Sequence, residues 1–255
     1  MKDSLVPSVF KKREPSPSFF ATPQGLITAL LTTPLLYFAL HPRTWKRYKT
    51  AEYVTPDVLH RFKPNGPKPS PSSSSTLPPG QGTLAGKCTS VRDNDNFRLY
   101  HRPFWHRVLR FRVPATQKEL KDETIHVRLA GVDAPEAAHF GQQAQPYSAE
   151  AKQWLEQRVM EKTVFVRPLR RDQYGRLVSM VWTRSLFPPF RRNVNVDMLR
   201  AGWAVLYTAT GAEYDGMYEE LKQAELHARA TRRGMWASEK PLVSPGEHKK
   251  AGRKA

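Results

Sequence analysis

A stretch that cannot bury a core divides this chain into two unequal parts. Residues 63–82 read K-P-N-G-P-K-P-S-P-S-S-S-S-T-L-P-P-G-Q-G, so Pro, Ser and Gly predominate. Segments of this composition stay partly extended and disordered, because their side chains bury too little apolar surface to offset the entropy lost on ordering. We therefore predict a linker within residues 41–82 and a folded domain on its C-terminal side.

The N-terminal part contains a run of 22 residues without charge, Phe19 to Leu40. About 20 apolar residues cross the hydrocarbon core of a bilayer as a helix, and Tyr37 and Trp45 suit its interface. We predict a single transmembrane anchor over 19–40, preceded by a polar, basic tail over 1–18 and followed by a juxtamembrane segment that leads into the linker. A cleaved signal peptide is the main alternative. The orientation stays open, because basic residues flank the run on both sides.

The charge balance limits the class of partner. The chain carries 41 Lys and Arg against 23 Asp and Glu, a formal net charge of +18. This excess favours a polyanion, either nucleic acid or an anionic membrane surface, and no protein partner is evident. A single cysteine, Cys88, excludes an intrachain disulfide. The last residues, 237–255, form a basic tail that we expect to be disordered.

Apolar periodicity begins at Thr83 and continues to Trp236, which marks the folded domain. Short apolar runs bounded by turn residues predict strands, and apolar positions at helical spacing, followed by a glycine, predict helices. We expect a small β-barrel packed by helices, an α+β fold. The strands are expected over 83–91, 96–100, 125–132, 164–169 and 177–183, and the helices over 148–162, 195–202 and 214–233.

Charged side chains occur at three turns next to predicted strands. They are Asp93 and Asp95, then Arg128, Asp133 and Glu136, then Asp172 and Arg176. Each turn alone is compatible with an ordinary Asx-rich turn or a surface ion pair. Together they have the chemistry for cutting a phosphodiester. Carboxylate oxygens hold a hard cation such as Ca²⁺, a further carboxylate activates water, and arginines take up charge on phosphoryl oxygens.

In this order the motifs resemble the staphylococcal nuclease (thermonuclease-like) family. They are V-x-D-x-D, R-L-x-G-V-D-A-P-E, D-x-Y-G-R and a terminal R-R-G-M-W, and the similarity spans about residues 84–236. The resemblance implies an OB-like five-stranded barrel with about three helices, and calcium-dependent hydrolysis of DNA and RNA. The apolar N-terminal run, H-F-G-x-x-A-Q-P at 139–146 and R-R-D-Q-Y-G-R further resemble the fungal long chronological lifespan proteins. That similarity implies a membrane-anchored, single-pass, mitochondrial protein.

Carried over position by position, the resemblance implies a role for each charged residue. Asp95 and Asp133 would be carboxylate ligands of Ca²⁺, and Glu136 would be the general base or water-positioning carboxylate. Arg128 and Arg176 would bind the scissile phosphate and stabilise its transition state. Two further residues would contact neither the metal nor the phosphate. Asp93 would support the metal site, and Tyr174 would lie beside the nucleotide.

The chain departs from the family pattern at several positions. The family turn D-G-D-T is D-N-D-N here, so Asn94 replaces glycine; Asn adopts left-handed backbone more readily than most residues. Ala134 follows the second ligand in place of threonine, which leaves a main-chain carbonyl ligand at 134 unaffected. The tyrosines beside the family's pocket align near Thr208 and Thr210, with Tyr207 adjacent.

The insertion over residues 98–121 has no counterpart in the minimal domain. It is basic and aromatic, so it either grips a nucleic-acid strand by stacking and phosphate contacts or forms an extended, partly buried hairpin. A second function also stays open: a catalytically inactive module that keeps the barrel and binds nucleic acid or protein at a membrane. The intact Arg128, Asp133, Glu136 and Arg176 favour the enzyme.

Overall fold

The computed structural model describes Thr28, Thr32, Thr33, Leu40 and residues 45–62, 82–138, 143–184 and 191–238. The chain separates into two compact units, residues 1–44 and residues 45–255. The predicted span over 19–40 lies almost wholly outside the described residues. No helix in the described ranges is both long and apolar enough to cross a bilayer.

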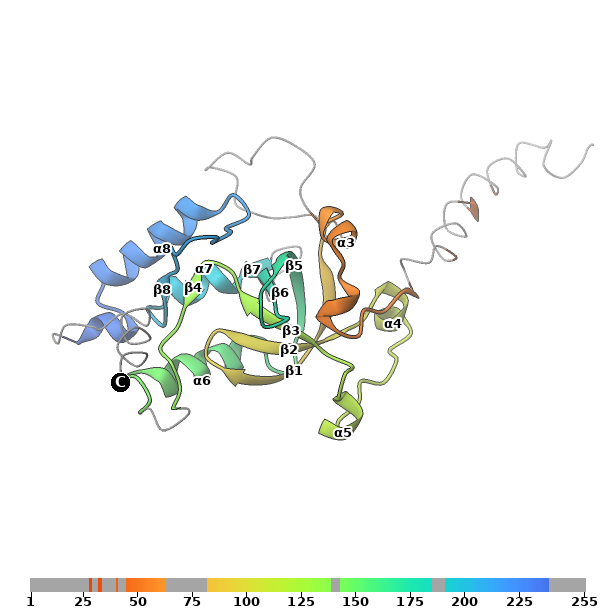
Figure 1. The fold of residues 1–255 in the computed structure, drawn as a ribbon, viewed down its shortest axis with the longest axis horizontal. Coiled ribbons are helices and arrows are strands. Elements are labelled where there is room, and N and C mark those ends of the chain that lie inside the picture. Colours follow the sequence, from red (N-terminus) through yellow and green to blue (C-terminus); the bar gives the residue numbers. More distant parts are fainter. Residues whose placement is uncertain are drawn as a thin grey trace, which may run out of the picture. The chain divides into compact units, whose positions relative to one another are not determined.

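Five strands of the second unit close into a mixed barrel, as the sequence predicts (Figure 1). They follow the order β3-β2-β1-β5-β6, and a parallel pairing of β3 with β6 completes the ring. The short β7 extends the sheet beyond β6, and β4 pairs with β8 outside it. The strands are β1 (Leu84–Asp93), β2 (Asn96–His101), β3 (Ile125–Leu129), β4 (Val132–Asp133), β5 (Thr163–Arg171), β6 (Leu177–Arg184), β7 (Arg191–Asn193) and β8 (Val205–Leu206).

Alternation along β3 fixes which side chains face the core. Ile125, Val127 and Leu129 are fully buried, while His126 and Arg128 are only partly buried. Because neighbouring residues of a strand point to opposite faces, His126 and Arg128 project together from the outer face of the barrel. The strand therefore supplies both a core layer and two polar side chains for a surface site.

Three helices pack on the barrel in the predicted order: α6 (Ser148–Val159), α7 (Val194–Arg200) and α8 (Tyr218–Ala230). Their boundaries differ from expectation in two places. The left-handed Tyr147 is the N-cap of α6, so Ser148 is its first helical residue rather than its cap. Helix α8 begins at Tyr218 and not at Tyr214, because Asp215 and Gly216 both have positive φ, which a continuous helix excludes.

After the end of β2, the insertion over 98–121 forms two short helices, so the hairpin, one of the two alternatives predicted for it, is wrong. Strand β2 ends at His101, and α4 (Phe104–Val108) and α5 (Gln117–Leu120) follow. Thr116 caps α5 through a reciprocal bond with Glu119. Figure 1 shows α4 and α5 on the side of the barrel away from α7 and α8.

Residues 45–62 pack into the same core as the barrel, although the sequence places the start of the domain at Thr83. This segment contains a 3₁₀ turn, Ala51–Tyr53, and α3, Pro56–His60. Its buried apolar side chains are Tyr48, Ala51, Val54 and Val58. The core of the described residues thus runs from Tyr48 to Met235 and takes no described side chain from residues 1–44. The predicted linker residues 63–81 lie outside the described ranges.

Candidate functional site

Two carboxylates meet one arginine at the end of the barrel where β1 turns into β2. Nη2 of Arg128 lies 3.1 Å from Oδ2 of Asp95 and 3.9 Å from Oδ1 of Asp133. All three side chains are largely buried. The structure therefore brings together the predicted metal ligands and one predicted phosphate ligand, from three separate elements.

Strand pairing explains this convergence. Asn96 is the cross-strand partner of Arg128, and the amide of Leu129 donates to the carbonyl of Asp95 at 2.9 Å. The chain then reverses through Gly131, whose φ of +67° and close approach to Leu221 both exclude a larger side chain. This reversal places Asp133 opposite Arg128. The glycine in R-L-A-G-V-D is thus required for the backbone conformation that positions Asp133.

A polar network holds the β1–β2 turn in place. Asp93 accepts from the amide of Asn94 and from the side chain of Asn96, both at 2.9 Å. Asn96 also donates to Asp95 at 3.1 Å, and its carbonyl oxygen lies 2.9 Å from Nε2 of His126. The side-chain hydrogen bonds of Asp93 are thus with Asn94 and Asn96 of the turn, and its supporting role at a metal site stays a prediction. Asn96 orients Asp95, a role the sequence does not reveal.

The side chain of His126 is the outer end of this network. Burial, together with the nearby charges of Arg98 and Arg176, lowers its pKa to about 4. The imidazole is therefore neutral at physiological pH. Because Asn96 uses its amide to donate to the aspartates, the neutral ring donates from Nε2 to the carbonyl oxygen of Asn96.

Asn94 joins the turn to the loop after β4. Its backbone does not adopt the left-handed conformation that we expected at this position. Instead its side chain is 1% exposed and donates to the carbonyl of Pro135 and to Oγ of Ser148. The asparagine that replaces the family glycine is thus a cross-link between Asp95's turn, the D-A-P-E loop and the start of α6.

The backbone of Glu136 is fixed from both sides by Gln145. The amide of Glu136 donates to Oε1 of Gln145 at 2.7 Å, and the amide of Gln145 donates to the carbonyl of Glu136 at 2.9 Å. Gln145 is itself buried. Gln145 belongs to the H-F-G-Q-Q-A-Q-P run at 139–146. The sequence of that run does not reveal that Gln145 bonds the backbone of Glu136.

The β5–β6 hairpin presents the third set of charges. Nε of Arg176 donates to Oδ2 of Asp172 at 2.7 Å, and Oδ1 of Asp172 accepts from the amides of Tyr174 and Arg176. Leu177, the next residue, pairs with Val127 of β3, so this hairpin lies beside the strand of Arg128. Tyr174 is 70% exposed at the tip, 5.2 Å from the Arg176 guanidinium. The ion pair of Arg176 in the described structure is with Asp172, not with Asp95 or Asp133.

Tyrosine side chains border the cluster on the side of β8. The guanidinium carbon of Arg128 lies 5.6 Å from the ring centre of Tyr207, and the hydroxyl of Tyr214 donates to the carbonyl of Tyr207. Thr208 and Thr210, the positions that align with the family tyrosines, are exposed. Tyr207 is therefore the aromatic residue that a ligand at Arg128 would meet.

The electrostatics of the cluster favour a charged arginine. Burial lowers the pKa of Arg128, but the negative charges of Asp95 and Asp133 raise it by more, so the net shift is upward. The two carboxylates face one point, as oxygen ligands of a hard cation must. No group of three or more His, Cys, Asp or Glu side chains in the described ranges is placed to hold a metal. The donor set fits Ca²⁺ only if main-chain carbonyl oxygen and water complete it, which is usual for that ion.

Comparisons with known proteins identify the family to which this chain belongs. Residues 126–238 match the model of the staphylococcal nuclease homologue family. A "Probable endonuclease LCL3" of Schizophyllum commune is 44% identical over 242 residues, which cover 92% of this chain and 76% of that protein. A protein of the same name from Paracoccidioides lutzii is 41% identical, covering 90% of this chain and 64% of its own length. The Aspergillus niger counterpart is 42% identical, covering 82% and 74%.

Proposed function

Because the chain belongs to the staphylococcal nuclease family, we propose that it is an endonuclease that hydrolyses phosphodiester bonds of DNA or RNA with Ca²⁺ as its cofactor. The observation that carries the proposal is the meeting of Asp95 and Asp133 at one nitrogen of Arg128, with Glu136 on the loop that follows. A barrel kept only for binding has no need of two buried carboxylates at this point.

Glu136 is the residue we assign to water activation. In hydrolysis a water oxygen forms a bond to phosphorus while one ester P–O bond breaks, and a base must accept the water proton. The backbone of Glu136 is held by Gln145 in both directions. Its carboxylate is therefore presented from a fixed main chain, as a positioned base requires.

Arg128 and Arg176 are assigned to the phosphoryl oxygens. A guanidinium binds two oxygens at once and gains most where negative charge grows, in the transition state. Arg128 is already drawn toward the cluster by Asp95 and Asp133. Arg176 must be shared between Asp172 and the substrate, so we propose that phosphate binding draws its side chain away from Asp172. The side chains of Tyr207 and Tyr174 then bind the nucleotides on either side of the scissile phosphate.

Asp95 and Asp133 are the residues that would hold Ca²⁺, with Ala134 contributing its carbonyl. When bound, the ion supplies positive charge to the reacting phosphate. The two carboxylates also keep Arg128 charged and oriented, and Asn96 holds Asp95 in place for both roles.

The experiment is hydrolysis of a fluorescent single-stranded oligonucleotide by the full chain in detergent. We expect cleavage in millimolar calcium, none in a calcium chelator, and recovery when calcium is restored. Asp95→Asn should raise the calcium concentration needed for half-maximal rate. Binding of the oligonucleotide without any cleavage would instead assign the barrel to nucleic-acid recognition.

We also propose that residues 19–40 anchor the enzyme as a single span in a mitochondrial membrane. The support is the uncharged run of 22 residues and the resemblance to membrane-anchored relatives. A fluorescent fusion of the full chain should colocalise with mitochondria and resist extraction with alkaline carbonate. A fusion that lacks residues 1–44 should become extractable. A full-length fusion that carbonate extracts would contradict the anchor.

A further inference from the structure

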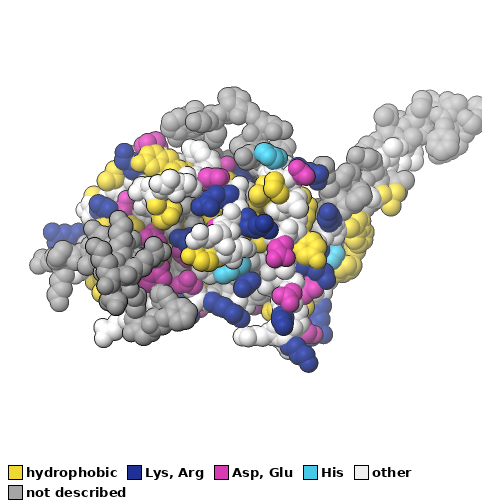
Figure 2. Space-filling view, in the orientation of Figure 1, with side chains coloured by type: hydrophobic (Ala, Val, Ile, Leu, Met, Phe, Trp, Pro, Cys, Tyr) yellow, Lys and Arg dark blue, Asp and Glu magenta, His cyan; other side chains and the backbone are white. Residues whose placement is uncertain are grey.

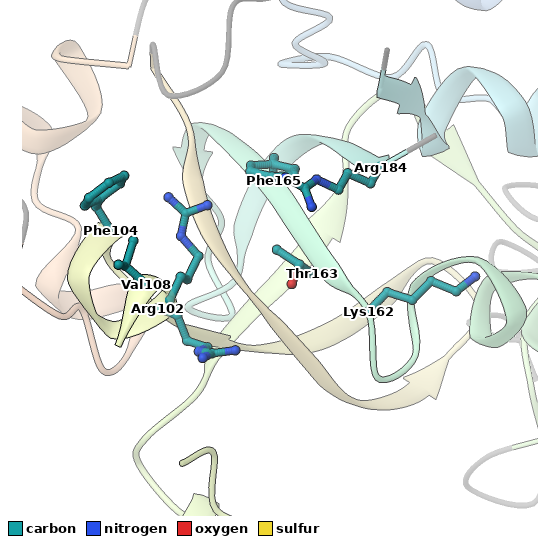
Figure 3. A pocket seen from close by; sticks show the side chains of 8 residues that line it. Arg102, Phe104, Val108, Lys162, Thr163, Phe165 and Arg184 are labelled. Carbon is teal, nitrogen blue, oxygen red and sulfur yellow. The ribbon is translucent and has the colours of Figure 1, made fainter. Parts of the chain in front are cut away.

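A cavity lined with positive charge lies on a part of the domain that the proposed nuclease site does not use. Its volume is about 580 Å³, and it opens between α4 and the strands β5 and β6 (Figure 3). Figure 3 shows Phe104 and Val108 on one side, with Phe165 and Arg184 on the other. We call it the cationic cavity; its lining residues are Arg102, Phe104, Arg107, Val108, Lys162, Thr163, Phe165 and Arg184.

The cations of this cavity have no carboxylate partner among the residues that the structure describes. None of Arg102, Arg107, Lys162 and Arg184 takes part in an ion pair there, whereas Arg47, Arg128, Arg167 and Arg176 all do. Arg191 adds a further charge, since its guanidinium stacks 3.6 Å from the ring centre of Phe165. An assembly of like charges without counterions is unfavourable unless an anion joins it.

The like charges of the cavity oppose one another. Burial lowers the pKa of Arg107, and the charges of Arg102 and Arg184 lower it further. The same causes act on Arg191, where burial is joined by the charges of Arg107 and Arg184. In addition, Nε of Arg107 and Nε of Arg102 are buried without a hydrogen-bond acceptor in the described structure. Both side chains thus have hydrogen-bonding capacity that a phosphate oxygen would satisfy.

The cationic cavity is at the opposite end of the barrel from Arg128. Strand β2 begins at Asn96, beside the nuclease site, and leads to Arg102 in the cavity. Strand β6 begins at Leu177, paired with Val127, and ends at Arg184. At about 3.3 Å per residue the two sites are separated by about 20 Å. One bound phosphate group cannot contact both.

Exposed apolar side chains lie on and next to α4, the helix that lines one side of the cavity. Val108 is 52% exposed and Leu109 is 51% exposed, and Trp45, Phe104 and Phe111 are also exposed. We call these five residues the α4 face. Trp45 belongs to it because its ring stacks on Trp105 at 5.8 Å. Figure 2 shows hydrophobic side chains at the surface in the region of α4, among Lys and Arg side chains.

We propose that the α4 face rests on a membrane surface and that the cationic cavity binds the phosphate of an anionic phospholipid headgroup. The cations match the charge of the headgroup, and the exposed apolar side chains match the boundary of the acyl region. Only residues 41–44 separate the predicted span from Trp45, so the chain would leave the bilayer at the α4 face. This inference goes beyond the proposed nuclease activity and does not depend on it.

The aliphatic side chains favour lipid over a second nucleic-acid strand. A single strand binds through aromatic stacking and backbone charge, and Phe104 and Phe111 would serve that purpose. Val108 and Leu109 present no ring, and contact with a phosphate backbone would leave them beside polar groups. A lipid surface uses both these side chains and the cations.

The experiment is hydroxyl-radical labelling of the full chain mixed with phosphatidylcholine vesicles that contain increasing fractions of phosphatidic acid. The readout is labelling of the peptide that carries Phe104 to Phe111, relative to a peptide of α8. We expect labelling of the α4 peptide to fall as phosphatidic acid increases, and to stay high in pure phosphatidylcholine. Because labelling of the α4 peptide is compared with labelling of a peptide of α8 in the same chain, the result does not depend on whether residues 19–40 span the bilayer.

Two double variants test the cavity itself. A cation near an anionic membrane contributes a factor of about five to binding, so Arg107→Gln with Arg184→Gln should weaken docking about 25-fold. Lys222→Gln with Arg229→Gln removes the same charge from α8 and should leave docking unchanged. The thermal unfolding temperatures of both variants should equal that of the parent, which shows that they fold whether or not the chain is a nuclease.

Three outcomes would overturn the proposal. Labelling of the α4 peptide that is equal in both lipids excludes headgroup binding. Equal loss of docking in both double variants would mean that docking depends on the net charge of the protein and not on the cationic cavity. Protection of the α4 peptide by inorganic phosphate or an oligonucleotide without vesicles assigns the cavity to a soluble phosphate or a nucleic-acid strand.

Discussion

The side-chain amide of Asn94 donates to the main-chain carbonyl of Pro135, and so bonds the β1–β2 turn directly to the D-A-P-E loop. Asp95 lies on the first of these segments and Glu136 on the second. This buried hydrogen bond therefore helps to fix the position of the proposed metal ligand Asp95 relative to the proposed base Glu136. The second bond of Asn94, to Ser148, ties both segments to α6.

Asn94→Ala should lower kcat more than it lowers stability. Loss of two buried hydrogen bonds costs about 1–3 kcal/mol of unfolding free energy, while displacement of Asp95 from Glu136 should reduce kcat by about 100-fold. Ser148→Ala removes only one of the bonds of Asn94 and should leave kcat within a few-fold. Thermal unfolding and steady-state kinetics measure the two effects. If Asn94→Ala retained full kcat, the cross-link would have no role in the site.

Arg128→Gln should reduce turnover by about 100- to 1000-fold, the usual loss when one donor to the transition-state charge is removed. The substitution also removes the cation that Asp95 and Asp133 share. Arg98→Gln is a matched control on the neighbouring strand. Equal losses in both variants would mean that Arg128 acts only through overall charge.

Stability should fall in mild acid because of His101. Burial, together with the charges of Arg47 and Arg107, lowers its folded-state pKa to about 3, whereas a histidine in the unfolded chain titrates at about 6.5. Stability is therefore fully present above pH 6.5 and is lost as pH falls toward 3. At pH 5 the loss is about 2 kcal/mol. Nδ1 of His101 accepts from the amide of Tyr48 at 3.0 Å, which requires the neutral ring.

Urea unfolding at neutral pH and at pH 5 measures this loss. His101→Gln keeps an acceptor near the Tyr48 amide without a group that titrates in this range. In this variant the free energy of unfolding should fall by about 2 kcal/mol less between neutral pH and pH 5 than in the parent. His126 contributes in the same direction but over a narrower window, since its folded-state pKa is about 4. An unchanged slope in His101→Gln would show that the ring protonates in the folded protein.

A chain that begins at Thr83 should be much less stable than one that begins at Trp45. Residues 45–62 bury Tyr48, Ala51, Val54 and Val58 in the barrel core, and Arg47 and Lys49 pair with Glu123. Burial of side chains of this kind contributes about 1.5–3 kcal/mol each, so removal should cost about 5 kcal/mol or more. Differential scanning calorimetry of the two chains tests this. Equal unfolding temperatures would mean that the segment only covers the surface.

The sequence predicted the barrel well because its signals are local. Alternation of apolar and polar residues in I-H-V-R-L and the long apolar run of β6 mark the strands, and R-L-A-G-V-D carries its own turn residue. The predicted convergence of Asp95, Asp133 and Arg128 also holds, since the strand pairing of β2 with β3 brings them together.

The parts that the sequence did not predict depend on contacts between distant segments. Nothing local shows that Tyr48 packs against His101, or that Gln145 fixes Glu136. The insertion reads as strand from its aromatic content, yet Pro103 breaks β2 and starts α4. Arg176 bonds to Asp172 because the hairpin closes on that carboxylate, which spacing alone does not reveal.

The most direct test of the nuclease assignment compares the parent chain with Glu136→Gln. The full chain is assayed in millimolar calcium for cleavage of a single-stranded oligonucleotide, and in parallel for equilibrium binding of a non-cleavable phosphorothioate oligonucleotide. We predict rapid cleavage by the parent, at least about 1000-fold slower cleavage by Glu136→Gln, and equal binding by both. Cleavage by Glu136→Gln at the parent rate, or no cleavage by a parent that binds, would contradict this prediction.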